Sequence, residues 1–508
     1  MRALLKYLCV FSFFLIIFAV IQFSFSGLLD TDPYYHIRHA VLYRQGLSTE
    51  NFPWVRLTPF LSNYTDLWYG YHKLLSLFMF GNLVVAAKFF IAAVDALLFV
   101  IFYGLLRYLK IHYSFFWTVI LFVISPAFLG RLFLLRPHVL DIIFFLLGLL
   151  CLFSRRYILL GFIAFVFAIT HQLAPLFLIT ILVFSLTDSL VKRQFIWQPM
   201  VSGFIGMTSG IALHPNPLMY LYGIYLAFVK IPLFSFLGKI GGFGSEIRSM
   251  FSGNEILGWL TNTGIPLLLY LFCLFIFLSW RKQPSFRYFI VWILTSVWLV
   301  VAIIIIRGWE FFVPLVVLLG AMTIDSYFEN EEKEIIEKPF FNIPFKGKCN
   351  RLVCFLLIGL LVINVLFVLR LRPGFDFTPY EKASEWLKQN TPQHSVVFLS
   401  FWHLFPYFFY NNQSNWYTTA HDPIFLYEYD PKLYWLWYHL VTDGKACEER
   451  KCKEEPFKDA AEIIKNRFGA NYVVIEPEKL PIFAEVIKKN ERFNFLFSSG
   501  PVSIYEIQ

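Results

Sequence analysis

With 58% hydrophobic and only 15% charged residues, this chain of 508 residues has more apolar side chains than one soluble core can cover. The formal net charge of +9 does not indicate a nucleic-acid partner, because the basic residues come as pairs between apolar runs and form no single patch. The composition therefore excludes an ordinary soluble protein and predicts a polytopic α-helical membrane protein.

The apolar runs are long enough to cross a bilayer, since a helix needs about 20 mostly apolar residues to span roughly 30 Å of hydrocarbon. About eleven runs meet this requirement. The predicted spans are residues 5–25, 83–106, 113–129, 138–153, 157–171, 173–190, 199–213, 263–280, 286–306, 309–327 and 352–370. The stretch 218–237 is either a further membrane-embedded helix or an interfacial one. The first span also has the length of a signal peptide, but it lacks a small-residue cleavage site.

The distribution of Lys and Arg predicts the orientation, because short cytoplasmic loops carry an excess of these residues. Arg2 and Lys6 place the N-terminus in the cytoplasm, and every second connection after the first span is basic. These connections contain Arg107, Lys110, Arg155, Arg156, Lys192, Arg193, Arg281, Lys282, Lys346, Lys348 and Arg351. The segments left for the outer face are the loops 27–80, 130–137 and 214–262 and the C-terminal segment 371–508.

The character of the chain changes after the last predicted span, where polar and apolar residues begin to alternate with helical and strand periods. The predicted elements are a helix at 380–388, a strand at 395–399, a helix at 458–468 and a strand at 472–475. A helix followed by a short buried strand, twice, is typical of a small α/β domain. We therefore predict a transmembrane domain at 1–371 and an extracytoplasmic α/β domain at 372–508.

Two cysteines, Cys447 and Cys452, flank the polar stretch ACEERKC in the segment predicted to lie outside the cell. An oxidising compartment and this loop spacing allow a local disulfide, with two free thiols as the alternative. The remaining cysteines lie in or beside predicted spans and are interpreted as small apolar residues. They are Cys9, Cys151, Cys273, Cys349 and Cys354.

Two carboxylates, Asp30 and Asp32, directly follow the first span in the stretch LDTDPYYHIRH. Charges close to hydrocarbon are costly and seldom kept without a role, and carboxylates can bind a divalent cation or accept a proton. The alternative is structural. Pro33 is well suited to be the first residue of a helix, and Asp32 would then be the N-cap of that helix.

The stretch DTDPYYHIRHAVLYRQG resembles the first outer-loop motif of oligosaccharyltransferase catalytic subunits and their relatives among the GT-C glycosyltransferases. Those enzymes move sugars from polyprenyl phosphate carriers. The resemblance implies a many-helix bundle, a long first outer loop and a C-terminal outer α/β domain. It also implies that Asp32 is the catalytic carboxylate with Asp30 as its partner, and it makes His36 and Arg38 candidate substrate-binding residues.

The chain also departs from that family. Oligosaccharyltransferases complete a metal site with a second acidic pair in the next outer loop, whereas SPAFLGRLFLLRPHVLD offers only Asp141, inside the next predicted span. A bound Mg²⁺ or Mn²⁺ would therefore have Asp32 as its one identified ligand, and the cofactor stays open. The stretch SFWHLFP after the strand 395–399 lacks the aspartate with which the family reads its sequon. These departures favour a relative with another acceptor.

A polyprenyl phosphate needs cationic partners at the outer membrane edge. Arg307 resembles in position the late-bundle arginine that contacts the lipid phosphate in GT-C enzymes, and its alternative is an interfacial arginine paired with Glu310. A second cationic group comes from the second outer loop, for which a solvated loop is the alternative. Its members are Arg131, Arg136 and His138. The histidines at two outer span ends, His171 and His214, are expected to be hydrogen-bonded structural residues.

Two further stretches leave their role open. The glycine-rich 238–248 could order around a ligand or be a plain connector, and it lacks the spacing of a phosphate-binding loop. The aromatic tract 416–438 could stack on sugar rings or dock the outer domain on the membrane helices.

The function predicted from these features is transfer of a sugar or glycan from a polyprenyl-phosphate-linked donor to a glycan, lipid or protein acceptor on the outer face. Asp32 would act as general base, and Arg307 with the second-loop cations would hold the phosphate leaving group. One alternative is a non-catalytic carrier of lipid-linked glycan, although such transporters usually show paired repeats and polar sites at mid-membrane. Another is a scaffold in envelope assembly, for which Asp30 and Asp32 would be dispensable.

Overall fold

The computed structural model describes residues 2–46, 51–241, 256–279, 285–328, 348–371, 374–420, 422–452 and 459–508. Several sequence features lie outside these described residues. They are residues 242–248 of the glycine-rich stretch, Arg281, Lys282, residues 329–347 of the basic inner segment, His421 and the side chains of Cys349 and Cys354.

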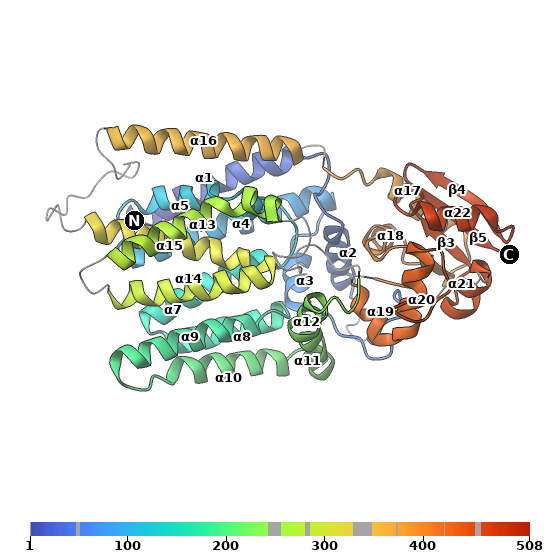
Figure 1. The fold of residues 1–508 in the computed structure, drawn as a ribbon, viewed down its shortest axis with the longest axis horizontal. Helices are drawn as coiled ribbons and strands as arrows, with labels where there is room; N and C mark the ends of the chain where they lie inside the picture. The colour runs from blue at the N-terminus through green and yellow to red at the C-terminus, as the bar shows by residue number, and fades with distance from the viewer. Residues whose placement is uncertain are drawn as a thin grey trace.

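The first part of the chain is a bundle of long helices that run side by side (Figure 1). Its helices are α1 (Arg2–Ser24), α4 (Leu83–Tyr108), α5 (Ser114–Val123), α6 (Pro126–Leu132), α7 (His138–Ser154), α8 (Tyr157–Thr170), α9 (Pro175–Lys192), α10 (Gln198–Ala212), α13 (Ile256–Ser279), α14 (Phe286–Ile304), α15 (Trp309–Phe328) and α16 (Lys348–Leu371). A short 3₁₀ turn, η4 (Ile306–Gly308), precedes α15. The prediction of a protein built from many apolar helices is therefore confirmed.

Six helices among the described residues are long and apolar enough to cross a membrane, or seven if the bent pair α5 and α6 is one span. Shorter apolar helices account for α7, α8 and the described parts of α13 and α16. Length and composition alone thus support a membrane protein without fixing the number of spans at eleven.

The predicted span 113–129 is not one straight helix, because the chain bends by 89° between α5 and α6. Proline restricts the residue before it to extended backbone, and Ser125 is extended and accepts a hydrogen bond from the Phe128 amide as N-cap of α6. A broken helix leaves carbonyls that a bilayer cannot satisfy. The Asn364 side chain of α16 donates to the Val123 carbonyl at 2.8 Å. The break is therefore held by a partner from another helix.

The end of α1 is fixed to α4, so the motif that follows has a defined start. Phe14 stacks on Phe99 with ring centroids 4.4 Å apart. Buried Lys88 donates to the Phe25 carbonyl at 2.7 Å, which satisfies a carbonyl just beyond the last turn of α1. The chain then turns into α2 (Asp32–Arg44) at the end of the bundle that carries the C-terminal part, which we call the domain end.

Several short helices cover the domain end (Figure 1). They are α2, α3 (Tyr69–Ser76), α11 (Pro217–Tyr225), η1 (Leu226–Lys230) and α12 (Ile231–Phe236). The last three correspond to the stretch 218–237. Figure 1 shows α11 and α12 at the domain end beside α19 (Pro423–Tyr429) of the C-terminal part, which favours the interfacial alternative for this stretch. By length and composition, however, Pro217–Phe236 is one of the six helices that could cross a membrane.

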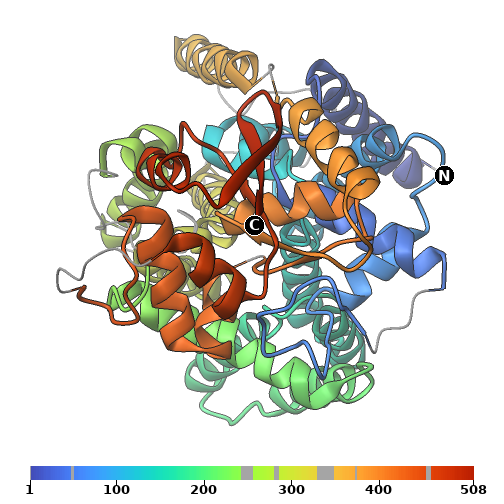
Figure 2. The ribbon, with the colours of Figure 1, turned by 90° about the vertical axis from the view of Figure 1, so that its right-hand side faces the viewer.

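The C-terminal part is a five-stranded sheet with helices packed on it, and Figure 2 shows this part lying across the domain end. Its elements are α17 (Thr378–Asn390), β1 (Val396–Leu399), η5 (Trp402–Leu404), α18 (Phe405–Asn411), β2 (Trp416–Tyr417), α19 (Pro423–Tyr429), α20 (Pro431–Thr442), α21 (Ala460–Phe468), β3 (Tyr472–Ile475), α22 (Pro481–Lys489), β4 (Phe493–Ser499) and β5 (Val502–Ile507). The strand order is β2-β1-β3-β5-β4, with β1 parallel to β2 and β3, and β5 antiparallel to β3 and β4. The predicted helix–strand units correspond to α17–β1 and α21–β3.

The first loop contributes backbone to this sheet. The Tyr417 amide of the edge strand β2 donates to the Trp54 carbonyl at 2.8 Å, and the Arg56 amide donates back to Tyr417 at 2.9 Å. On the other side of the domain end, Glu428 of α19 binds Lys230 at 2.5 Å and accepts from the Tyr222 hydroxyl at 2.8 Å. The C-terminal part is therefore joined to the membrane part through both backbone and side chains.

The aromatic tract 416–438 is partly buried inside the protein, with Tyr429 as an exposed member. Tyr417, Tyr434 and Trp437 are buried. The Trp437 indole donates to the Leu399 carbonyl at 3.2 Å, and the Tyr434 hydroxyl bonds to the backbone of Gly241 at 3.0 Å. These contacts favour the docking alternative for the tract.

The two cysteines of the polar stretch ACEERKC lie in contact with each other. Loss of solvent and the contact with the Cys447 thiol raise the pKa of Cys452 to about 11. Cys151 and Cys273 are buried, as small apolar residues would be. The pairing of Cys447 with Cys452 stays a prediction.

In protein isolated from cell membranes without reductant, we expect a disulfide bond between Cys447 and Cys452. Their thiols are neighbours, and the predicted compartment is oxidising. Mass spectrometry of the unreduced protein after alkylation measures this. Buried Cys151 serves as the unpaired reference in the same sample. Alkylation of both Cys447 and Cys452 would contradict the prediction.

The orientation of the bundle can be measured by cysteine labelling. In a background with Cys447 and Cys452 replaced by serine, Gln45→Cys and Arg450→Cys should both react with a membrane-impermeant maleimide in intact cells. Both positions are exposed. Arg155→Cys, in a connection predicted to be cytoplasmic, is the control and should react only after permeabilisation. Reaction at one of the two outer positions alone would mean that an odd number of spans has been missed.

Candidate active site

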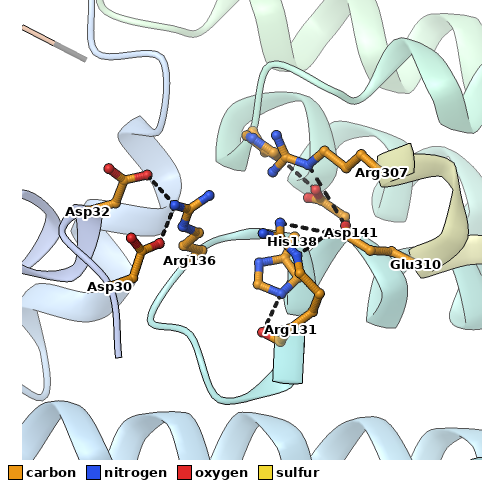
Figure 3. A network of polar contacts seen from close by, with 9 residues as sticks. Asp30, Asp32, Arg131, Arg136, His138, Asp141, Arg307 and Glu310 are labelled. Carbon is orange, nitrogen blue, oxygen red and sulfur yellow. Dashed lines mark hydrogen bonds and ion pairs between the residues drawn. The ribbon is translucent and has the colours of Figure 1, made fainter. Parts of the chain in front are cut away.

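Three connections between helices meet at the domain end and bring together the charged residues that the sequence singled out (Figure 3). At the first, Asp30 lies in the α1–α2 connection and Asp32 begins α2. At the second, Arg131 lies near the end of α6, Arg136 lies in the connection to α7, and His138 begins α7. At the third, Arg307 lies in η4 and Glu310 in the first turn of α15. These side chains form two groups of opposite net charge.

The first group has two carboxylates and one guanidinium. Arg136 Nη2 forms ion pairs with Asp30 Oδ2 and, at 2.9 Å, with Asp32 Oδ2. The Asp30 side chain also accepts from the Thr31 amide at 2.7 Å. Asp32 is the most open of the three charged side chains, with 32% of its side-chain surface exposed against 22% for Asp30 and 14% for Arg136. This carboxylate group has a formal charge of −1 and leaves Asp32 accessible to a ligand.

Asp32 is the first residue of α2 and not its N-cap, which is Thr31. Pro33 is thus the second helical residue, one position later than the structural alternative requires. No side-chain cap hydrogen bond is made at this helix start, and the Thr31 hydroxyl instead donates to Asp32 Oδ1 at 3.3 Å. The Asp32 carboxylate therefore serves the ion pair with Arg136, with a favourable placement at the positive end of the helix dipole.

The second group has two guanidinium ions and one carboxylate. Arg131 binds Glu310 Oε1 at 2.7 Å through both Nε and Nη2, and Arg307 Nε lies 3.9 Å from Glu310 Oε2. The pairing of Arg307 with Glu310 is therefore present but long, and Arg131 is the closer partner. The two arginine side chains are 23% and 22% exposed, whereas that of Glu310 is only 4% exposed. This cationic group has a formal charge of +1.

His138 lies between the two groups (Figure 3). Its ring is buried, and Nε2 bonds to the Arg131 carbonyl at 2.9 Å, so it fixes the backbone of the α6–α7 connection. One turn along α7, buried Asp141 bonds to His171 Nδ1 at 2.5 Å. His138 is thus placed to position Arg131, and His171 is the hydrogen-bonded structural residue expected from the sequence.

Two of the candidate substrate-binding residues, His36 and Arg38, contact neighbouring elements of the protein. Buried His36 bonds through Nδ1 to His72 Nε2 at 2.8 Å. Arg38 donates from Nε to the Tyr410 carbonyl at 2.5 Å and lies over the Tyr410 ring. Burial lowers the pKa of Arg38. In this structure the two side chains pack α2 against α3 and α18, and their role as ligand contacts stays a prediction.

The donors around Asp32 do not fit a divalent cation. Mg²⁺ and Mn²⁺ prefer several oxygen ligands, whereas the side chain that lies against both carboxylates is the guanidinium of Arg136. The second outer loop adds Arg131 and His138 and no exposed carboxylate. Among the described residues, one group of His and Asp side chains has metal-ligand spacing, namely His39, Asp66 and His72. It does not include Asp32.

A buried carboxylate that the sequence motifs did not single out lies beside the stretch that follows β1. The carboxyl ends of the parallel strands β1 and β3 meet there. Glu476, directly after β3, bonds to His403 Nε2 at 2.8 Å, to the Tyr380 hydroxyl at 2.6 Å and to Lys479 Nζ at 2.8 Å. A charged residue directly after a buried strand, at the edge where ligands of α/β sheets bind, is the signal that could have identified it.

No protein-family model matches the sequence, and no curated protein matches it. The fold, in contrast, is similar to that of solved membrane glycosyltransferases, an archaeal oligosaccharyltransferase and a mycobacterial arabinofuranosyltransferase. The oligosaccharyltransferase AglB of Archaeoglobus fulgidus, solved with an inhibitory peptide and a dolichol-phosphate, superimposes with a TM-score of 0.63 at 14% identity over 99% of this chain and 74% of AglB. A complex of the same archaeal enzyme with Zn and sulfate gives a TM-score of 0.62 at 14% identity, over 97% and 73% of the two chains.

The arabinofuranosyltransferase AftD from mycobacteria superimposes with a TM-score of 0.54 at 14% identity. The match covers 98% of this chain and 41% of AftD. The resemblance seen in the motif after the first span is thus matched by a likeness of fold along almost the whole chain.

The buried carboxylate allows a prediction of pH dependence. Burial raises the pKa of Glu476, but hydrogen bonds from His403, Lys479 and Tyr380 outweigh it and lower the pKa from 4.5 to about 2. Because the pKa is lower in the folded state, the ionised carboxylate stabilises the fold at pH values above its ordinary pKa. This stabilisation is lost as the pH falls from about 4.5 towards 2. It amounts to about 3 kcal/mol.

Glu476→Gln should therefore lower the melting temperature at neutral pH, with a difference from wild type that narrows below about pH 4.5. Thermal unfolding of the purified protein followed by intrinsic fluorescence measures it. Glu485→Gln, at an exposed carboxylate on α22 that is paired with Lys489, is the matched control and should change little. A difference in melting temperature between wild type and Glu476→Gln that does not vary with pH would contradict a lowered pKa of Glu476.

Proposed function

We propose that this chain is a membrane glycosyltransferase that transfers a sugar or glycan from a polyprenyl-phosphate-linked donor to an acceptor at the outer face of the membrane. The observation that carries the proposal is the pair of oppositely charged groups at the domain end (Figure 3). One contains the accessible carboxylate of Asp32, and the other contains two arginines that share one carboxylate.

Each group suits one half of a displacement at the sugar C1. The acceptor hydroxyl gives its proton to Asp32 while its oxygen forms a bond to C1. The bond between C1 and the phosphate oxygen breaks, and the electron pair leaves with the polyprenyl phosphate. Arg131 and Arg307 bind the phosphate oxygens and stabilise the charge that develops on them. The excess positive charge of their group supports this assignment.

Arg136 has a positioning role in this scheme. Because it binds both Asp30 and Asp32, it holds the two carboxylates at one place and offsets part of their mutual repulsion. In the related family a divalent cation supplies positive charge beside the first-loop carboxylates. The donor set here assigns that charge to the protein itself, and no step of the proposed reaction passes through a metal.

The donor class is supported by the fold and by the chemistry of the cationic group. The archaeal relative AglB was solved with a dolichol-phosphate, and partly exposed arginines at a membrane edge would bind the same kind of headgroup. The acceptor is proposed to differ from a sequon asparagine, because His403 and Glu476 occupy the region that follows β1 and β3. A glycan, a lipid or another protein group are the remaining acceptor classes.

The topology that accompanies this function has eleven spans, a cytoplasmic N-terminus and an outer C-terminal part. We count α5 and α6 as one broken span and assign α11 and α12 to the interface. The membrane domain is then 1–371, and the outer α/β domain is 372–508. A transporter of lipid-linked glycan is the rival, and the position of the charged groups at one end of the bundle favours the enzyme.

The proposal is tested by Asp32→Asn, which keeps the size of the side chain and removes the charge. Loss of a positioned general base lowers rates by about 10²–10⁴-fold. We expect that loss in transfer, followed as release of polyprenyl phosphate from a polyprenyl-phosphate-linked sugar by membranes with equal amounts of folded protein. A transporter would release no polyprenyl phosphate. Arg131→Gln should also slow release, by about 10²-fold.

Asp376→Asn is the matched control, because Asp376 is an exposed carboxylate at the start of α17 that accepts a hydrogen bond from the Thr378 amide. It should release polyprenyl phosphate at the wild-type rate. Asp30→Asn should slow the release of polyprenyl phosphate less than Asp32→Asn does if Asp30 only orients Asp32. Release at the wild-type rate by Asp32→Asn would overturn the mechanism and with it the preference for an enzyme.

A further inference from the structure

A second polar cluster lies inside the first loop, apart from the charged groups at the domain end. It consists of His39 on α2, His72 on α3 and Asp66, just before α3. All three side chains are buried, with no more than 1% of each exposed to solvent. One ligand atom from each of the three lies within 4.8 Å of those of the others. A carboxylate and two imidazoles in such a place need either an exact set of hydrogen bonds or a bound cation.

The Asp66 carboxylate is at the centre of the cluster. His72 Nδ1 lies 2.7 Å from Asp66 Oδ2, and His39 Nδ1 lies 3.6 Å from the same oxygen. The hydroxyl of Tyr43 also reaches this oxygen, at 2.8 Å. The other carboxylate oxygen, Oδ1, accepts from the Trp68 amide at 2.9 Å, which fixes the orientation of the group. Two imidazole nitrogens and a phenol oxygen therefore surround one carboxylate oxygen.

These separations are close to those of a tetrahedral zinc site. Zinc binds nitrogen and oxygen at about 2.0–2.2 Å, which spaces neighbouring ligands by about 3.3–3.5 Å. The contact of 3.6 Å between His39 and Asp66 is longer than a hydrogen bond and matches this spacing. The shorter contact between His72 and Asp66 would have to widen by a few tenths of an ångström. A small rotation of one ring provides that change.

The far nitrogen of each ring already has the partner that a ligating histidine needs. A histidine that binds a metal through one nitrogen usually donates from the other, and this second bond sets its tautomer. His39 Nε2 contacts the Tyr64 hydroxyl at 2.8 Å, and His72 Nε2 contacts His36 Nδ1 at 2.8 Å. Both rings are thereby turned so that Nδ1 faces Asp66.

We propose that His39, Asp66 and His72 form a structural site for a divalent transition metal, best suited to Zn²⁺, with the Tyr43 hydroxyl as the nearest candidate for a fourth ligand. Imidazole ligands favour zinc over Mg²⁺ and Ca²⁺, and a closed, buried site favours a structural over a catalytic role. The metal would join α2 and α3 through the irregular segment between them. Since Asp32 begins α2, the site would hold the helix that presents the candidate catalytic carboxylate.

The test uses the full chain, purified in detergent, freed of its affinity tag, stripped with a chelator and then supplied with Zn²⁺ alone. Elemental analysis after gel filtration should find about one zinc per chain. The melting temperature should rise by about 3–6 °C, because an ion that binds only the folded state stabilises it. Replacement of Zn²⁺ by Co²⁺ should give the visible absorption bands of a tetrahedral site, and Zn²⁺ should abolish them.

His72→Gln removes one ligand and should reduce retained zinc at least about tenfold, since removing even an outer partner of a metal ligand weakens binding about 10–100-fold. The control is His112→Gln, at an exposed histidine that bonds to Asp325 at 2.7 Å far from the cluster; it should retain zinc like wild type. If His72→Gln fails to fold, the cobalt spectrum of the wild type alone tests whether the tetrahedral site exists.

Two results would overturn the proposal. Folded wild type that retains no zinc and shows neither a thermal shift nor cobalt bands would make the cluster a hydrogen-bond network. Equal zinc retention by wild type and His72→Gln would place the metal elsewhere on the chain. Because the readouts are metal content, stability and spectra, they are independent of whether the protein transfers sugar.

Discussion

The ion pairs of Arg136 with Asp30 and Asp32 are the contact on which the arrangement of the domain end depends. They join connections that are 106 residues apart in the chain and that begin and end in different helices of the bundle. Without this guanidinium, two carboxylates would face each other beside hydrocarbon, where uncompensated charge is costly. With it, the carboxylate group keeps one negative charge and the neighbouring cationic group keeps one positive charge. This one arginine therefore holds the two carboxylates together and reduces the charge of their group from −2 to −1.

The bend between α5 and α6 is the second constraint, because it sets where the arginines lie. A straight helix through residues 113–129 would carry the chain further along the bundle axis. The turn at Ser125 instead directs α6 across the domain end, so that Arg131 reaches Glu310 at the start of α15. The bilayer tolerates the break since Asn364 satisfies the carbonyl that it exposes. A polar residue in α16 thus supports a charged site that it does not touch.

Much of this arrangement could be predicted from local sequence. The length of the apolar runs predicts a membrane protein, the helix and strand periods predict the C-terminal α/β part, and the charges beside an apolar run mark Asp30 and Asp32. The partner of these carboxylates could not be predicted, because it depends on how two distant connections fold against each other. The pair Ser125-Pro126 indicates a helix break inside an apolar run, which the length of the run alone does not show.

Two other features of the structure were not predicted from the sequence, for different reasons. The cluster of His39, Asp66 and His72 has no regular spacing, since its members are brought together by α2 and α3 packing through a segment without secondary structure. Glu476 could have been noticed, because a carboxylate rarely follows a buried strand without a partner. His36 and Arg38 were selected by the motif alone. His36 lies one turn after Asp32 on the same face of α2, but it is buried against His72 of α3. Arg38 lies on another face and contacts Tyr410 of α18. A motif gives the order of residues, whereas the helix decides their directions.

The backbone bonds between Trp54, Arg56 and Tyr417 have a consequence for biosynthesis. Strand β2 is the edge of its sheet, and an uncovered edge is a template for pairing with another chain. Here that edge is covered by a segment that is translated before nearly all of the membrane helices. The segment is therefore made long before its partner strand at residues 416 and 417. A C-terminal fragment produced alone would leave this edge uncovered and open to pairing with another chain.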